Sequence, residues 1–191
     1  MPKIAYLTGI PGAGKSFVSR SAMQDKLATY IIGDEVRRRA VQVMCPNVKP
    51  RSVWSEGLWD QLCRHCKVHI AMDSVVNGYV FPVIDLKRPL LVDAYVTSHI
   101  GFREAFACAL KRGGYEVAAE QLFWIDPPLP QVVQQANSRI DNGERPGEGR
   151  IDEKECNRRR EIIVRRVRET QCTQEATAEE ILHKLTEFFS S

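Results

Sequence analysis

One eight-residue segment near the start of the chain has the residue types and spacing of a phosphate-binding loop. Residues Gly9 to Ser16 read Gly-Ile-Pro-Gly-Ala-Gly-Lys-Ser and match G-x-x-x-x-G-K-[ST] at every specified position. Glycines let such a loop wrap so that backbone N–H groups point at phosphate oxygens, and the following helix N-terminus adds partial positive charge. A glycine turn without a ligand is the weaker alternative, because the segment also stands between an apolar strand and a helix. The segment therefore predicts a nucleoside triphosphate site.

Roles within this loop follow from the chemistry of a magnesium–nucleotide complex. Lys15 is long enough to reach the β- and γ-phosphates, and the Ser16 hydroxyl is a ligand for Mg²⁺. We expect ATP to be the phosphate donor, with adenine assumed from the class of protein. The residues of the loop expected to hold the nucleotide are Gly9, Gly12, Ala13, Gly14, Lys15 and Ser16.

The rest of the sequence narrows the class of nucleotide-dependent protein. It contains no Asn-Lys-x-Asp motif of the kind that reads guanine. Asp93, which follows an apolar run, is followed by Ala94 and not by the second acid of many ATP-hydrolysing machines. Both observations favour phosphoryl transfer to a bound acceptor. A P-loop switch or binding module, which uses nucleotide only to change shape, is the alternative from another class.

Two carboxylates follow apolar runs, at the places where an open α/β sheet binds its ligands. Asp34 is the candidate to orient an acceptor hydroxyl and take its proton. Asp93 is the candidate to hold Mg²⁺ through water or to contact the acceptor. The ordinary alternatives are a cap for the helix that starts at Glu35 and a turn residue at a strand end, respectively. Further candidate acceptor contacts on the segment after Asp93 are Tyr95 and Arg103.

These features together resemble a known family. The segments that carry the resemblance are Gly9 to Ser16, Gly33-Asp34-Glu35-Val36-Arg37, Val92-Asp93 and an arginine-bearing stretch near 139 to 150. They resemble the P-loop kinases grouped around polynucleotide 5′-hydroxyl kinases and zeta-type toxins, over about residues 3 to 170. The resemblance implies that Asp34 is the general base and that Arg37 contacts an acceptor phosphate.

The resemblance also implies a lid. In that family an arginine-bearing lid folds over the ATP phosphates, and residues 139 to 151 stand in its place here. Arg139 and Arg145 are the candidate catalytic arginines, and Arg150 is a candidate contact to the nucleotide. Family lids often begin with an arginine about where Gln135 and Ala136 stand, which leaves open which arginine serves.

The preferred acceptor is a 5′-hydroxyl or a hydroxymethylated base in a polynucleotide. Asp34 with Arg37 supports it, and so does an arginine-rich tract over residues 158 to 168, which could follow a nucleic-acid backbone. The favoured interpretation of the tract itself is a solvated helix face paired with glutamates at helical spacing. The second choice of acceptor is a small metabolite, a nucleotide or a sugar nucleotide of the kind that zeta-type toxins phosphorylate.

The elements that must position these groups alternate between strand and helix. This alternation predicts an α/β fold, a P-loop-type three-layer sandwich with a parallel sheet, in a single domain over residues 1–191. The segment 46 to 88 is longer than a minimal kinase needs. It forms either a helical cap over the acceptor site or a core helix with a surface loop. The expected strands are Lys3–Thr8, Tyr30–Ile32, Leu90–Val92 and one within Tyr115–Ile125; the expected helices are Ser16–Ala28, Glu35–Met44, one from Ser52 to Gly78, Ile100–Lys111, Pro130–Arg139, Asp152–Arg168 and Ala178–Phe189.

Composition and charge exclude several classes of protein. With 43% hydrophobic and 27% charged residues, the chain is too apolar and too weakly charged to be disordered. No apolar run approaches the roughly 18 residues of a membrane span, and no signal-peptide region is evident, so we expect no membrane partner and a cytoplasmic location. A net charge of +3 permits a nucleic-acid partner without requiring one.

The cysteines predict thiols and no metal centre. Six cysteines are spread through a chain large enough to be stable without disulfides. Cys63, Cys66 and His69 are three residues apart, but structural zinc takes four ligands, usually from two separated pairs, and no second Cys-x-x-Cys is present. We therefore expect reduced thiols throughout, buried thiols at Cys63 and Cys66, and no structural zinc.

Overall fold

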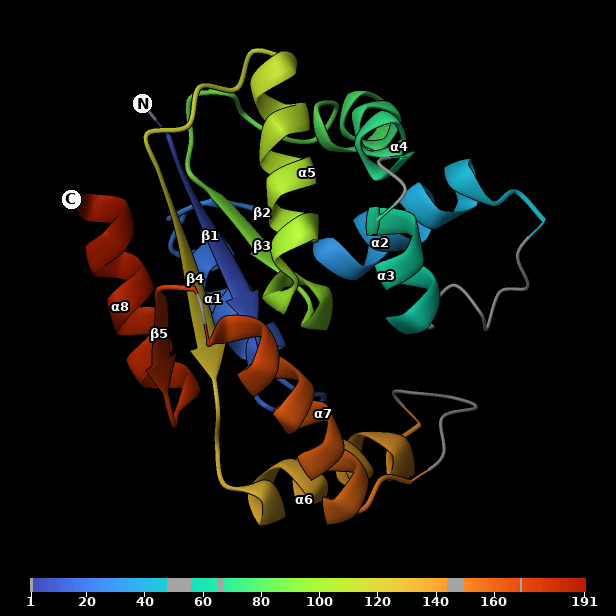
Figure 1. Ribbon diagram of the computed structural model, residues 1–191. Coiled ribbons are helices and arrows are strands. Elements are labelled where there is room, and N and C mark those ends of the chain that lie inside the picture. The colour runs from blue at the N-terminus through green and yellow to red at the C-terminus, as the bar shows by residue number, and fades with distance from the viewer. Residues whose placement is uncertain (1, 48–55, 65–66, 144–149, 169) are drawn as a thin grey trace.

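The chain folds as three layers, with a parallel sheet between two layers of helices (Figure 1). The computed structural model describes residues 2–47, 56–64, 67–143, 150–168 and 170–191. Arg145, Cys66 and Glu169 lie outside the described residues. Within the described ranges, no helix combines the length and the apolar character that a membrane crossing requires.

In the described part of the chain, five strands form one parallel sheet: β1 (Lys3–Thr8), β2 (Thr29–Ile32), β3 (Leu90–Asp93), β4 (Ala119–Ile125) and β5 (Cys172–Glu175). Their order across the sheet is β2-β3-β1-β4-β5. Because β1 lies in the middle, its carboxyl end opens at the centre of the ligand-binding edge of the sheet. The edge strand β5 was not predicted from the sequence, because its residues Cys-Thr-Gln-Glu form neither an apolar run nor an alternation of apolar and polar residues.

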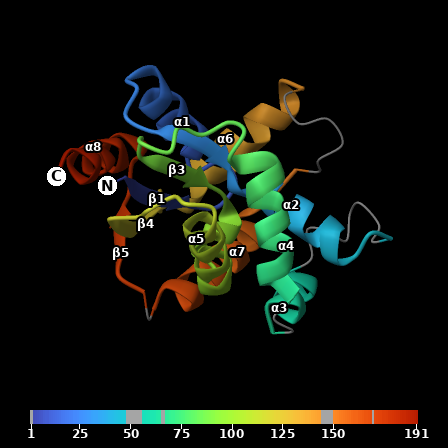
Figure 2. The same cartoon turned by 90° about the horizontal axis from the view of Figure 1, so that it is seen from above.

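Alternate residues of β1 face the two helical layers, as a doubly covered strand requires. Ile4 and Tyr6 pack in one apolar cluster, whereas Ala5 and Leu7 pack in the other. Figure 2 shows helices on both sides of the sheet. The helices in chain order are α1 (Lys15–Gln24), α2 (Gly33–Met44), α3 (Glu56–Arg64), α4 (Lys67–Val75), α5 (Ile100–Arg112), α6 (Leu129–Asp141), α7 (Glu153–Val167) and α8 (Ala178–Ser190).

Helix α1 ends four residues before the predicted boundary at Ala28. Asp25 stands at the end of the helix, and Lys26 follows in the left-handed region with φ 54°. The Leu27 N–H donates to the Ala22 carbonyl, which turns the chain into β2. The apolar residues after Gln24 had suggested a longer helix, but they belong to this turn.

The single long helix predicted between Ser52 and Gly78 is wrong. The structure has α3, then α4, and then a π-helical turn η2 (Val76–Val80), in which the Phe81 N–H donates to the Val76 carbonyl. That prediction depended on an apolar stripe at helical spacing, which runs Trp54, Leu58, Leu62, Cys66 and Ile70. Its last member, Ile70 of α4, is 73% exposed, so the stripe does not continue along the buried face of α4.

Helix α4 is part of the core. Val68 and Met72 are buried in the same cluster as the sheet residues, and α4 packs between α2 and α5. Trp59 brings α3 to this cluster with no exposed surface. The five described cysteines are free thiols, and no described group of three or more His, Cys, Asp or Glu side chains is arranged to hold a metal ion.

Candidate active site

The phosphate-binding loop connects the carboxyl end of β1 with the first residue of α1, where its motif requires it to lie. Gly12 and Gly14 have φ of +90° and +99°, and the Ala13 N–H donates to the Ile10 carbonyl at 3.1 Å. Gly14 is also the residue before the helix, so the positive end of the helix dipole faces the loop. The predicted strand–loop–helix context of the loop is therefore confirmed.

Gly12 provides a direct test of the packing of this loop. A Cβ at Gly12 would lie 2.7 Å from the Val132 carbonyl oxygen and 3.2 Å from the Ala136 Cβ, both on α6. We expect Gly12→Ala to lower the free energy of unfolding by roughly 2–3 kcal/mol, from the left-handed backbone and the contact with α6 together. Urea unfolding measures this loss of stability.

The matched control is Gly114→Ala, where φ is +91° but nothing lies within 4 Å of the added Cβ. For this variant we expect the free energy of unfolding to fall by about 1 kcal/mol. Equal losses for the two variants would contradict the role of α6.

A cavity of about 670 Å³ opens beside the loop. Its volume suits a nucleotide and part of an acceptor. Residues from the loop, α1, β2, α2, β3 and α6 meet there, and they include most of the site predicted from the sequence. The lining residues are Pro11, Gly12, Gly14, Lys15, Ser16, Phe17, Arg20, Tyr30, Ile32, Asp34, Asp93, Tyr95, Gln135 and Arg139.

Asp34 lines this cavity from the first turn of α2. The helix begins at Gly33, with Ile32 in the capping position and no side-chain hydrogen bond at the cap. The alternative that Asp34 caps a helix starting at Glu35 is therefore wrong. Gly33 lets the start of α2 lie close to the end of β3, because a Cβ there would be 3.0 Å from the Ala94 Cβ.

Asp93 ends β3, where it is paired with Leu7 of β1 and Ile32 of β2. Its residue surface is only 7% exposed, and the Ser19 hydroxyl donates to its Oδ2 at 2.7 Å. Tyr30 also donates to this carboxylate; burial and the Asp93 charge raise the pKa of Tyr30 well above its ordinary value. Asp93 is thus a fixed acceptor of hydrogen bonds inside the cavity.

The donor set of this cavity suits magnesium. The Ser16 hydroxyl and the Asp93 carboxylate line the same space and offer the hard oxygen ligands that Mg²⁺ prefers. Mg²⁺ usually takes only one or two protein ligands and completes its shell with water and substrate phosphates. The residues present therefore fit the ion that a nucleotide site of this kind requires.

A second cavity of about 280 Å³ adjoins the first and shares Pro11, Asp34 and Tyr95 with it. Arg37 of α2 lines it as a buried residue, with its guanidinium 5.6 Å from the ring centre of Trp59. Three arginines thus face a small space that ends at Asp34. The remaining lining residues are Arg158, Arg159 and Ile162 of α7.

Glu155 holds the two arginines of α7 in the second cavity. Its carboxylate accepts from Arg158 Nε at 2.7 Å and from Arg159 Nε at 2.6 Å. These hydrogen bonds, first from Arg158 and then from Arg159, lower the pKa of Glu155 to about 2. Two further arginines of the tract are directed elsewhere: Arg160 makes a bidentate pair with Asp126, and Arg166 points inward with a side chain 13% exposed. Of the arginines of the tract, Arg158 and Arg159 line the cavity.

The lowered pKa of Glu155 leads to a pH-dependent stability. The unfolded carboxyl titrates near pH 4.3, so the stabilisation is complete above about pH 4.5 and is lost as the pH falls toward 2. We expect Glu155→Gln to lower the free energy of unfolding at pH 7 by at most about 1 kcal/mol, because solvent screens the pair. Urea unfolding at pH 7, 5 and 3 checks this. The difference from wild type should shrink at pH 3. The control Glu161→Gln should show little change with pH, because the partner of Glu161 is the neutral Asn157 amide, which a glutamine oxygen can still accept from. A difference independent of pH would rule out the charge effect.

The lid residues have separate positions. Arg139 lies in the last turn of α6 and lines the first cavity, one turn after Gln135, which lines it too. Arg150 is 66% exposed and pairs with Asp141 at 2.5 Å, away from the lining of either cavity. The predicted lid residue Arg145 lies outside the described part of the chain. Of the predicted lid arginines, the described residues thus place Arg139 at the nucleotide cavity.

Arg103 has a role in the scaffold. It donates to the carbonyls of Thr97 at 2.7 Å and Ser98 at 3.1 Å and lines neither cavity. These carbonyls belong to the 3-10 turn η3 (Tyr95–Ser98), so Arg103 supports the turn that carries Tyr95. The expectation that it contacts the acceptor directly does not agree with this geometry.

Sequence reasoning missed several residues of the two cavities. Arg20 stands four residues after Ser16, a helical spacing that could have placed it beside the loop. Phe17 follows the loop directly and Ile32 ends the second predicted strand, so their positions at the predicted ligand edge were a second available signal. No local pattern indicated that Arg158 and Arg159 line a cavity with Asp34.

The fold and the loop together define a class of protein, that of α/β proteins with a phosphate-binding loop at the carboxyl end of the central strand of a parallel sheet. The structure is similar to a gluconokinase from Sinorhizobium meliloti 1021, with TM-score 0.55, 11% identity, and coverage of 99% of this chain and 92% of that one. It is also similar to the shikimate kinase from Acinetobacter baumannii in complex with shikimate, with TM-score 0.53, 15% identity, and coverage of 100% and 94%. A third similar structure is the tunicamycin resistance protein of Deinococcus radiodurans, with TM-score 0.53, 15% identity, and coverage of 98% and 95%.

These likenesses confirm the α/β fold with a five-stranded parallel sheet covered on both faces. No family model matches this sequence, and no curated protein resembles it closely in sequence. The narrower resemblance to polynucleotide kinases and zeta-type toxins stays a prediction.

Proposed function

We propose that this protein is an ATP-dependent kinase that transfers the γ-phosphate to a hydroxyl group of an acceptor bearing an anionic group. The observation that carries the proposal is the place of Asp34. It lines both the cavity beside the phosphate-binding loop and the smaller arginine-lined cavity. A carboxylate at the junction of a donor site and an anion site is where a phosphoryl transfer needs its base. The three similar structures, two of them kinases by their titles, support the same class.

Each cavity residue has a role in this mechanism. Lys15 binds the transferred phosphoryl group electrostatically, and Arg139 reaches the same cavity from α6. Asp34 accepts the proton of the acceptor hydroxyl as its oxygen attacks phosphorus, and the nucleoside diphosphate leaves. Ser16 and Asp93 would hold Mg²⁺, which neutralises charge on the β- and γ-phosphate oxygens.

The smaller cavity supports an acceptor with a phosphate or a carboxylate. Arg37, Arg158 and Arg159 present planar donors suited to either anion. A polynucleotide with a 5′-hydroxyl or a hydroxymethylated base is our first proposal, since its phosphates would meet these arginines. A small anionic metabolite, nucleotide or sugar nucleotide is the second proposal, and the small volume of about 280 Å³ supports it.

One experiment separates these acceptors. Transfer of labelled γ-phosphate from ATP is measured with single-stranded and duplex oligonucleotides, mononucleotides, sugar nucleotides and sugar acids. A polynucleotide acceptor should show a KM that rises steeply with salt, because its binding releases counterions. A small acceptor should show a weak salt dependence. Labelling of none of these acceptors would contradict the kinase proposal and favour a nucleotide-dependent switch.

A further inference from the structure

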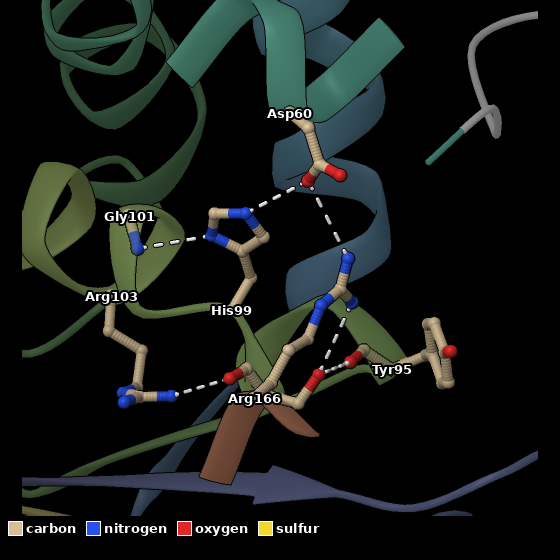
Figure 3. Close-up of polar contacts among 7 residues, drawn as sticks. Asp60, Tyr95, His99, Gly101, Arg103 and Arg166 are labelled. Atoms are coloured by element: carbon tan, nitrogen blue, oxygen red, sulfur yellow. Dashed lines mark hydrogen bonds and ion pairs between the residues drawn. The ribbon is translucent and has the colours of Figure 1, made fainter. Parts of the chain in front are cut away.

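Two consecutive residues of α3 contact two arginines, Arg37 and Arg166, of which the first lines the smaller cavity and the second lies beside Tyr95, another lining residue. Trp59 points into the core with no exposed surface, 5.6 Å from the Arg37 guanidinium and 6.0 Å from the ring of Phe102. Asp60 points toward His99 and Arg166, as Figure 3 shows. Arg37 lines the acceptor cavity, so the first of these two contacts already bears on the site.

His99 joins Asp60 to the start of α5. Its Nδ1 accepts from the Gly101 N–H at 3.1 Å and so caps the helix (Figure 3). With Nδ1 occupied as an acceptor, the ring proton of the neutral imidazole is on Nε2, which donates to Asp60 Oδ1 at 3.0 Å. The carboxylate is thereby held at a defined place between α3 and the core.

Arg166 continues the contact to the cavity. Its Nη2 lies 3.7 Å from Asp60 Oδ1, and its guanidinium lies 5.8 Å from the ring centre of Tyr95. Its Nη1 donates to Ser98 Oγ at 3.4 Å, and Ser98 Oγ donates to the Tyr95 carbonyl at 2.9 Å. Arg166 therefore touches both the ring and the turn of Tyr95, a residue that lines both cavities (Figure 3).

We propose that α3 positions the acceptor site through adjacent side chains, with Trp59 holding Arg37 and Asp60 holding Tyr95 through Arg166. The inference assigns Trp59, Asp60 and Arg166 as positioning residues, and its kinetic consequence rests on the proposed kinase function. Arg166 is partly buried and interacts with both the Asp60 carboxylate and the Tyr95 ring, so its orientation is restricted. A fixed Arg166 in turn limits the positions that Tyr95 can adopt. The positioning itself is a property of the folded protein without substrate.

A spectroscopic experiment tests the positioning without assuming any activity. The protein is labelled with 3-fluorotyrosine, and the ¹⁹F resonance of Tyr95 among its five tyrosines is assigned with Tyr95→Phe. We expect Asp60→Asn to shift or broaden this resonance, because Arg166 loses its charged partner. The matched control is Asp73→Asn, which removes an ion pair between α4 and Arg112 of α5 and should leave the Tyr95 resonance unchanged. An unchanged Tyr95 resonance in Asp60→Asn overturns the proposal.

A kinetic experiment tests the consequence with the acceptor that the wild type phosphorylates. We expect Asp60→Asn to raise the acceptor KM by about tenfold, while kcat and the KM for ATP stay within about twofold. Asp60→Glu should recover part of the loss. Arg166→Lys combined with Asp60→Asn should add little to either single change, since both act on one contact. A uniform loss of kcat with no change in acceptor KM would indicate a merely structural role and overturn the assignment.

If no acceptor is labelled, the kinase proposal is contradicted. The Tyr95 resonance still decides whether α3 positions the site.

Discussion

Replacing Lys15 with alanine is expected to lower nucleotide-dependent phosphoryl transfer by about 100- to 1,000-fold, the usual cost of removing one stabilising donor. In the structure the Lys15 ammonium lies over the loop and donates to the Gly9 carbonyl at 2.7 Å and the Ile10 carbonyl at 3.3 Å. The loop and the helix N-terminus gather backbone N–H groups at the same place, so in the proposed kinase the ammonium lies where we expect the β- and γ-phosphates to bind. Alanine removes the positive charge of the loop, which would otherwise stabilise the negative charge on the phosphoryl group during transfer.

The experiment measures single-turnover transfer and urea unfolding for Lys15→Ala beside the control Lys184→Ala. Lys184 is an exposed lysine of α8 whose ammonium pairs with Glu187 at 3.3 Å, so its loss removes the same charge at a distance from the cavity. Both variants should fold with a free energy of unfolding within about 1 kcal/mol of wild type. Transfer at the wild-type rate by the folded Lys15→Ala variant would contradict the assignment of the nucleotide site.

Asp34→Asn is expected to lower transfer by about 100- to 10,000-fold while nucleotide affinity stays unchanged, which is the range for loss of a general base. Asparagine keeps the shape of the side chain and still accepts a hydrogen bond, but it cannot take the proton of the acceptor hydroxyl. Because Asp34 lines both cavities, this substitution tests directly whether the acceptor oxygen binds beside it.

Glu35→Gln is the matched control for Asp34→Asn. Glu35 lies beside Asp34 in the first turn of α2, and it pairs with Arg38 at 2.6 Å and Arg39 at 2.7 Å without lining either cavity. Both substitutions remove one negative charge near the positive end of the same helix, so both should have similar small effects on stability. Only Asp34→Asn should lose transfer; comparable losses in the two variants would mean that the helix terminus, and not proton transfer, accounts for the effect.

The elements that were predicted correctly are those whose signals are local. The strand Lys3–Thr8 is an apolar run that ends at a glycine, and the structure has the same boundaries. Helices over Ile100–Arg112 and Ala178–Ser190 have a regular apolar spacing and end within one residue of the predicted positions. The helices α3 and α4 were predicted as one, because both carry apolar residues at helical spacing, and only their packing shows that Ile70 lies outside the core.

The nucleotide part of the candidate site could be predicted from the sequence, whereas the acceptor part could be predicted only in part: Asp34, Arg37 and Tyr95 were named, but Arg158 and Arg159 were not placed in it. The loop from Gly9 to Ser16 is contiguous, and its conformation depends on glycines at fixed spacing, so the sequence alone was sufficient to identify it. The acceptor cavity combines Arg37 with Arg158 and Arg159, which are more than 100 residues away along the chain. Glutamates at helical spacing predicted the pairing of the two later arginines, which the structure shows with Glu155, but not their place in the cavity. Only the packing of α7 against α6 and η3 decides which of its arginines line the cavity with Asp34, because this packing depends on contacts that no local pattern contains.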